Sequence, residues 1–245
     1  KGEGSGVSFD EAQETFTARY THETVALAFA ITEEAIEDNL YDRLASRYTK
    51  ALARSMSNAK QVKAVEPLIQ GLPTTDGFDS GDGVSLFNTS HPTVAGTFQN
   101  TLTTQADLNE TSLEQSLIDI GQMTDERGLR VAARGVKMII PSELQFTAER
   151  LMKSQGRTGT ADNDINAIVS MGMIPQGYRV NNYLTDTDAF YILTDIPNGM
   201  KMFNRAPLTT AMEGDFDTGN VRYKARERYS FGVSDPRGIF GVEGA

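Results

Sequence analysis

The chain has 245 residues and more acidic than basic side chains, 33 against 23, which gives a formal net charge of −10. Hydrophobic residues make up 39% of it, enough for the core of one large domain or two modest ones. Proteins that wrap nucleic acid usually carry net positive charge, so dedicated DNA binding is not expected. The absence of cysteine excludes disulfides, thiolate metal ligands and a cysteine nucleophile.

The beginning of the chain shows no targeting signal. Its first residues, KGEGSGVSFDEAQ, are polar and glycine-rich, without a secretory pattern or an initiator methionine. We therefore expect that upstream residues have been cleaved or are disordered. No apolar run approaches the roughly 18 residues that a membrane-spanning helix needs, so no membrane association is predicted.

An extended segment followed by a long helix is predicted next. Apolar and polar side chains alternate from Thr15 to Ile31, which indicates one long strand or two strands separated at residues 22–24. Thr32 is a favourable N-cap for a helix about 34 residues long, which Pro67 and Gly71 should end. Such a helix is a structural spar, a coiled coil, or a pair broken near residues 57–58. Its candidate core residues are Ile36, Leu40 and Leu44.

The middle of the chain mixes helices and short strands. A capping box from Thr111 to Glu114 predicts a second helix, and a third helix follows Pro141. Residues 71–100 and 156–164 are typical of loops. Short strands are expected at residues 136–140, 168–173, 179–184, 189–193 and 200–204. The overall pattern is that of an α+β fold without internal repeats.

The strand predicted from Val221 to Val233 is the most informative segment. Its side chains alternate between an apolar and a cationic face. The apolar face offers the core candidates Tyr223, Tyr229 and Phe231, and the cationic face carries Arg222, Lys224, Arg226 and Arg228. Two partners suit these cations: nucleic-acid phosphates, or carboxylates of a neighbouring element or subunit. The net negative charge of the chain favours the carboxylates.

No catalytic, cofactor-binding or metal-binding residue is predicted. His22 and His91 belong to no recognised motif, and we expect His91 to make a backbone hydrogen bond in a turn. Phosphate-binding, nucleophile and zinc motifs are absent. Acidic residues cluster in turns, where Asp stabilises the turn geometry. These clusters are Asp76, Asp79 and Asp82; Asp186 and Asp188; and Glu213, Asp215 and Asp217.

Five segments in a specific order carry a family resemblance. They are TARYTHETVALAFAITEEAIEDNLYDRL, SLFNTSHP, MIIPSELQFTAERLM, YLTDTDAFYILTD and DFDTGNVRYKARERYSFGVSDPRG, which together span residues 17–238. In this order and spacing they resemble the major capsid proteins of tailed bacteriophages, which have the Hong Kong ninety-seven fold. The Mu-like major head subunits are the branch that the chain resembles most.

The resemblance implies a division of the chain into parts. Residues 1–21 would be the return arm of the E-loop, which lies over an adjacent subunit. Residues 22–101 would form the P (peripheral) domain with its spine helix near 32–66, and residues 206–245 its C-terminal strands. Residues 102–205 would form the A (axial) domain, which meets its copies at five-fold and six-fold positions. The implied contacts between subunits are Lys1, Glu3 and Phe9 in the arm, together with the four cations of the C-terminal strand.

The implied function is that of a structural subunit of an icosahedral phage head. It would form pentamers and hexamers around DNA, without cofactors, and would touch the DNA only by weak non-specific contact. Further implied partners are a portal, a scaffold or protease, and a decoration protein; the implied location is the virion, assembled in the cytoplasm of the host bacterium. The alternatives are an encapsulin-like shell that encloses proteins, a metal-dependent enzyme using the Asp-rich turns, and a nucleic-acid binder using the basic strand.

Overall fold

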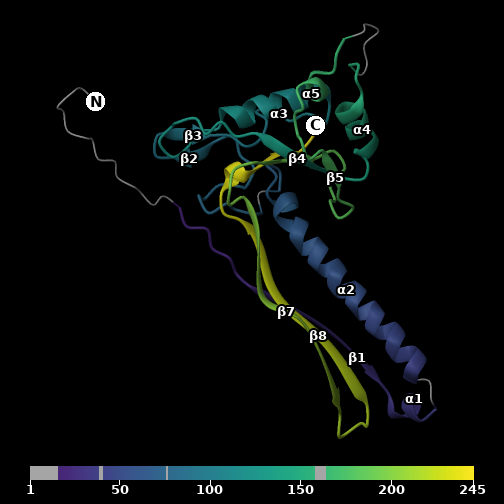
Figure 1. Cartoon of the computed structure of the whole chain (residues 1–245). Helices are drawn as coiled ribbons and strands as arrows, with labels where there is room; N and C mark the ends of the chain where they lie inside the picture. Colours follow the sequence, from purple (N-terminus) through teal and green to yellow (C-terminus); the bar gives the residue numbers. More distant parts are fainter. Residues whose placement is uncertain (1–15, 39–40, 76, 158–163) are drawn as a thin grey trace, which may run out of the picture.

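The computed structural model describes residues 16–38, 41–75, 77–157 and 164–245, without the side chains of residues 41–45. Figure 1 shows an elongated arm, made of a three-stranded sheet and one long helix, that extends from a wider body. The body holds a four-stranded sheet, most of the helices and the C-terminus.

The helical layer of the arm consists of two helices, α1 (Glu33–Glu37) and α2 (Tyr41–Gln70). Thr32 is the N-cap, as predicted, and its hydroxyl accepts a hydrogen bond from the N–H of Ala35. The prediction of one helix from residue 32 is wrong, because α1 ends at Asp38, whose N–H bonds back to Glu34. The alternative break near residues 57–58 is also wrong, because α2 is continuous there.

The end of α2 lies close to the predicted position. Pro67 does not end the helix, which continues through Gln70. A proline inside a helix removes one hydrogen-bond donor, and here this loss falls in the last turn. Gly71 follows the end of the helix, and its N–H bonds to the carbonyl of Pro67.

The sheet of the arm is antiparallel, in the order β1-β8-β7. Its strands are β1 (Glu23–Ile31), β7 (Met200–Gly214) and β8 (Val221–Val233). The predicted bounds of β8 are confirmed. β7 is much longer than predicted and continues past Pro207. This proline is tolerated because it falls at a bulge on an edge strand, where its nitrogen needs no hydrogen bond to the neighbouring strand. Residues 16–22 form no strand, contrary to prediction; instead the Tyr20 ring packs on Phe203, with 4.7 Å between ring centroids.

The sheet of the body has the order β5-β4-β6-β9, with β4 and β5 parallel and the other pairs antiparallel. Its strands are β4 (Gly135–Ile140), β5 (Tyr178–Val180), β6 (Phe190–Thr194) and β9 (Ile239–Val242). The other elements are the hairpin strands β2 (His91–Thr93) and β3 (Gly96–Phe98), the helices α3 (Glu110–Gln122), α4 (Gln145–Lys153) and α5 (Ala167–Ser170), and the 3-10 turn η1 (Pro236–Gly238).

Two local predictions in the body are wrong for identifiable reasons. The expected strand at 168–173 is instead the short helix α5, because the Asn166 side chain accepts hydrogen bonds from the N–H groups of Ile168 and Val169. The capping box of α3 is formed by Asn109 and Ser112, two residues before the predicted one, and each side chain bonds to the other's backbone. Asparagine is as good an N-cap as serine or threonine.

Three hydrophobic clusters hold the parts together. The largest lies between the body sheet and its helices and includes Leu113, Met138 and Ile192. The second joins the end of α2 to β6 and β9, and the third, in the arm, is small. Because Phe240 and Val242 of β9 belong to the body cluster, residues 206–245 contribute to both the arm and the body. The division into A and P domains stays a prediction.

Candidate functional site

One face of the arm sheet is open and cationic. Arg222, Lys224, Arg226 and Arg228 of β8 all lie on this face, and all four are exposed. Arg222 forms an ion pair with Asp215, in the turn between β7 and β8. Within the described part of the chain, Lys224, Arg226 and Arg228 have no ion-pair partner. We call this surface the cationic face.

The residues beside these cations are small. Residues directly opposite each other in an antiparallel pair share a face of the sheet. Those on β1 are Ala30, Ala28, Ala26 and Thr24, and those on β7 are Glu213, Ala211, Thr209 and Ala206. The cationic face therefore extends over all three strands of the sheet. Beside the four cations, β1 and β7 contribute one acidic side chain and no large apolar side chain.

The opposite face of β8 packs on α2. Ala225 contacts the cluster of Leu52 and Met56, and Tyr229 is 2% exposed. Tyr223 stacks on Phe29 of β1, with 4.9 Å between centroids. The remaining described core candidates, Tyr223, Phe231 and Ile36, are half-buried.

A buried ion pair lies on this same covered face. Glu227 is 4% exposed, and its Oε2 lies 3.0 Å from Nζ of Lys60 on α2. The Lys60 ammonium also lies 5.1 Å from the centre of the Tyr229 ring, a cation–π distance. Sequence reasoning missed Glu227, although strict alternation along β8 places it between Ala225 and Tyr229. Its partner was not visible in the sequence, because 167 residues separate the two.

The far end of the arm is acidic. Here α1 and the β7–β8 turn meet: a Cβ added to Gly219 would clash with Oε2 of Glu33. Phe216, at the turn, is fully exposed. The acidic residues of this end are Glu33, Glu34, Glu37, Asp38, Glu213, Asp215 and Asp217. We call this end, residues 33–38 and 213–220, the acidic tip.

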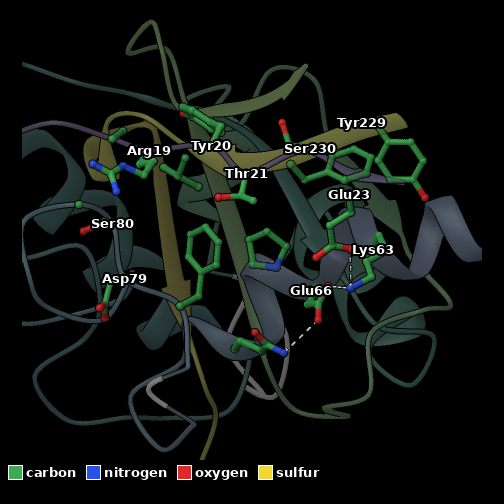
Figure 2. Close-up of a pocket in the computed structure, with 18 of the residues that line it drawn as sticks. Arg19, Tyr20, Thr21, Glu23, Lys63, Glu66, Asp79, Ser80, Tyr229 and Ser230 are labelled. Atoms are coloured by element: carbon green, nitrogen blue, oxygen red, sulfur yellow. Dashed lines mark hydrogen bonds and ion pairs between the residues drawn. The ribbon is translucent and has the colours of Figure 1, made fainter. Parts of the chain in front are cut away.

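A groove of about 450 Å³ lies where residues 17–23 cross α2 and β8 (Figure 2). Lys63 pairs there with Glu23 at 3.2 Å and Glu66 at 2.9 Å, and these two carboxylates raise the pKa of its ammonium. The hydroxyls of Tyr229 and Ser230, which also line the groove, are buried without a hydrogen-bond partner in the described structure.

His91 lies at the centre of a buried network in the loop region between α2 and α3. Its side chain is completely buried; Nδ1 lies 2.7 Å from Oδ2 of Asp82 and Nε2 lies 2.9 Å from Oδ1 of Asn100. The expected backbone hydrogen bond is wrong, because both ring nitrogens meet side-chain oxygens. The Oδ1 of Asn100 also accepts a hydrogen bond from the N–H of Asn88, so this amide oxygen joins two parts of the loop region.

This network lowers the pKa of the Asp82 carboxyl. Burial raises its pKa, but the hydrogen bonds from His91 and Ser80 outweigh burial and hold the pKa below its usual value. A carboxyl with a lowered folded-state pKa stabilises the fold above its unfolded-state value of about 3.9, and this contribution disappears as the pH falls through the lowered pKa.

We therefore expect Asp82→Asn to destabilise the protein most near neutral pH. Thermal unfolding of the wild type and the variant, measured from pH 7 down to pH 3, should give midpoints that converge as the pH falls. Midpoints that stay equally far apart at every pH would contradict this role of the Asp82 charge.

The other acidic clusters lie mostly in turns, but Glu213, which was predicted in a turn, belongs to strand β7. Asp186 accepts hydrogen bonds from the N–H groups of Asp188 and Ala189, as a turn aspartate does, and Asp79 is exposed. Asp76 is outside the described residues. Within the part that is described, no three potential metal ligands come together, and no helix is long and apolar enough to cross a membrane.

Some of the residues predicted as subunit contacts or as core lie outside the described part of the chain. Lys1, Glu3, Phe9 and Leu40 lie outside the described residues, and so does the side chain of Leu44. The surfaces that the structure does describe are the cationic face, the acidic tip and the groove of Figure 2. All three lie on the arm or at its base.

Comparisons with solved structures identify the fold. The capsid of Myoviridae phage XM1 matches 92% of the chain with a TM-score of 0.57 and 14% identity, over 74% of its own length. The capsid of an empty GTA particle matches 99% with a TM-score of 0.51 and 14% identity, over 81% of its length. The SrpI encapsulin of Synechococcus elongatus matches 91% with a TM-score of 0.54 and 9% identity, over 74% of its length. The predicted α+β capsid fold is confirmed.

Sequence comparison identifies the family. No curated protein matches the chain significantly. The sequence profile of the phage capsid protein family, in contrast, matches residues 14–242, from before the arm to the last strand of the body. Because that match covers nearly the whole chain, the protein belongs to the phage capsid protein family and is a structural subunit of an icosahedral phage head shell.

Proposed function

We propose that the protein assembles with copies of itself into pentamers and hexamers that close around DNA, and that it performs no catalysis. The observation that best supports this proposal is the arm. Its 13-residue strand β8 keeps one face covered by α2 and the other open, with its cations aligned. A monomer can leave such a face in water, but a row of cations without carboxylate partners repels itself, and a shell subunit has neighbours that can supply the carboxylates.

The parts of the fold suit the proposed roles. The arm, with α2 as the spine helix, corresponds to the P domain, and most of the body corresponds to the A domain. The return arm of the E-loop at residues 1–21 would reach an adjacent subunit and bring Lys1, Glu3 and Phe9 into contact there. The four cations of β8 would meet carboxylates of a neighbouring subunit.

Further partners follow from assembly as a phage head. A closed shell needs a portal for DNA entry, a scaffold or protease to guide assembly, and in some heads a decoration protein. We propose that assembly takes place in the cytoplasm of the host bacterium and that the packaged DNA makes only weak, non-specific contacts. The Mu-like branch of the family remains part of this proposal.

An encapsulin-like shell is the second candidate, since an encapsulin shares the fold. The family match favours the phage head. The two functions differ in the content of the shell: nuclease-resistant DNA in a head, and cargo protein in an encapsulin.

We expect the purified protein to form closed icosahedral particles, because its fold is that of shell subunits. Electron microscopy and light scattering of concentrated protein test this directly. Particles with the size and symmetry of a closed shell would support the function. Only monomers or small dimers, over a range of salt and protein concentrations, would contradict it.

A further inference from the structure

The cationic face needs a partner that the described chain does not supply. Alternate residues of a strand are about 6.8 Å apart, so each cation of β8 lies within one Debye length, about 8 Å, of the next and repels it. Only Arg222 has a carboxylate partner in the described part of the chain. A ligand with several negative charges along a line would relieve this repulsion over the whole row.

At the acidic tip, Asp215 is paired with Arg222, but the carboxylates of α1 and of its C-cap Asp38 have no ion-pair partner in the described part of the chain. Glu33 and Glu34 occupy the first turn of α1, where the helix dipole stabilises negative charge. Glu37 and Asp38 occupy its other end, where the dipole opposes negative charge, and no basic residue lies in the last turn. The helix dipole therefore favours the charges of Glu33 and Glu34 but not those of Glu37 and Asp38. A cation from another subunit would stabilise these two carboxylates.

We propose that the acidic tip of one subunit docks on the cationic face of a neighbouring subunit. This inference rests on the proposed function and names the surfaces that meet. The small residues beside the cations, such as Ala26 and Ala211, leave room for a protruding turn between them. Phe216, fully exposed at that turn, would lie on an arginine guanidinium, a favourable cation–π contact.

The contact must join different copies. Asp217 lies in the turn before β8, and Arg226 is five strand residues beyond the first residue of β8, about 17 Å along the strand. Two different surfaces of the molecule meet in such a contact. Unless the same pair of subunits makes it twice around a two-fold axis, the contact is heterologous and closes into a ring when the rotation between neighbours allows it.

Charge exchange tests the contact. The double variant Arg226→Glu with Arg228→Glu should reduce the assembled fraction at least about tenfold, because like charges would meet at each contact. The tip variant Glu37→Lys with Asp217→Lys should do the same. Combining the four substitutions should restore assembly, because the two surfaces are complementary again. The control Arg47→Glu with Arg54→Glu, on exposed positions of α2, makes the same change in net charge and should assemble normally.

A cysteine pair tests the geometry. The chain has no cysteine, so Asp217→Cys with Ala26→Cys introduces the only thiols. Ala26 lies opposite Arg226, too far along the sheet for a disulfide within one chain, which needs Cα atoms within about 7 Å. Oxidised particles of the double variant should therefore yield disulfide-linked multimers, whereas either single variant should not.

The outcomes separate this inference from the proposed function. If the wild type forms no particles, the function itself fails. If the wild type assembles but the charge variants assemble equally well, or the cysteine pair remains unlinked in particles, the docking contact is wrong. If the arginine variants form normal empty particles that no longer retain DNA, the cationic face binds nucleic acid and this proposal is overturned.

Discussion

Replacing Leu52 by Asp is expected to detach α2 from the arm sheet. Leu52 is 6% exposed and packs with Met56 and Ala225, and Val25 and Phe29 close the same cluster. A carboxylate there loses the apolar burial and is either desolvated or forced to take up a proton, at a cost of several kcal/mol. The arm cluster is small, so no neighbouring hydrophobic contacts compensate. A loss of about 4 kcal/mol corresponds to a fall of about 8–16 °C in the unfolding midpoint of a chain of this size.

The matched control for this variant is Ser57→Asp, on an exposed position of the same helix. It adds the same charge to α2 but should change the free energy of unfolding by less than about 0.5 kcal/mol. Hydrogen exchange would show where the damage lies: amides of β1 and β8 beside Ala225 should lose protection, while those of β4 and β6 keep it. Equal stability of the two variants would mean that α2 does not hold the arm through this cluster.

The arm was largely predictable from the sequence because its signals are local. Strict alternation between residues 221 and 233 defines β8 and its two faces without any tertiary information. Thr32 marks the start of α1 by the chemistry of its own hydroxyl. The predicted strand at residues 200–204 was too short, because β7 continues past Pro207, which lies in a bulge at a sheet edge.

The contacts between distant residues were not predictable. The partner of His91 is Asn100, with Asp82 on its other side, and no spacing rule joins these three residues. Glu227 and Lys60 meet only because α2 crosses β8. The acidic tip was visible as charged turns, but its extent depends on Gly219 lying against Glu33, which is a tertiary contact. Sequence patterns therefore indicated the charged residues, and the fold showed which of them lie on one surface.

The second large effect is expected for Asn100→Leu, at the junction between the loop region and the C-terminal strand. Asn100 is completely buried, and its Nδ2 donates to the carbonyls of Leu86, at 2.7 Å, Pro236, at 3.0 Å, and Ile239, at 3.4 Å. Its Oδ1 accepts from Asn88 and His91. Leucine has a similar volume but no polar atom, so five buried or half-buried partners lose a hydrogen bond.

Each buried polar group left unsatisfied costs about 1–3 kcal/mol, so we expect a total loss of at least about 4 kcal/mol. The measurement is thermal unfolding, with Asn182→Leu as the control because Asn182 is exposed. Hydrogen exchange should also show lost protection in β9, since the N–H of Gly241 bonds to the carbonyl of Asn100. If Asn100→Leu is as stable as Asn182→Leu, with β9 still protected, then the hydrogen bonds of Asn100 do not hold the C-terminal strand in the body. Packing of Phe240 and Val242 in the body core would then hold β9 on its own.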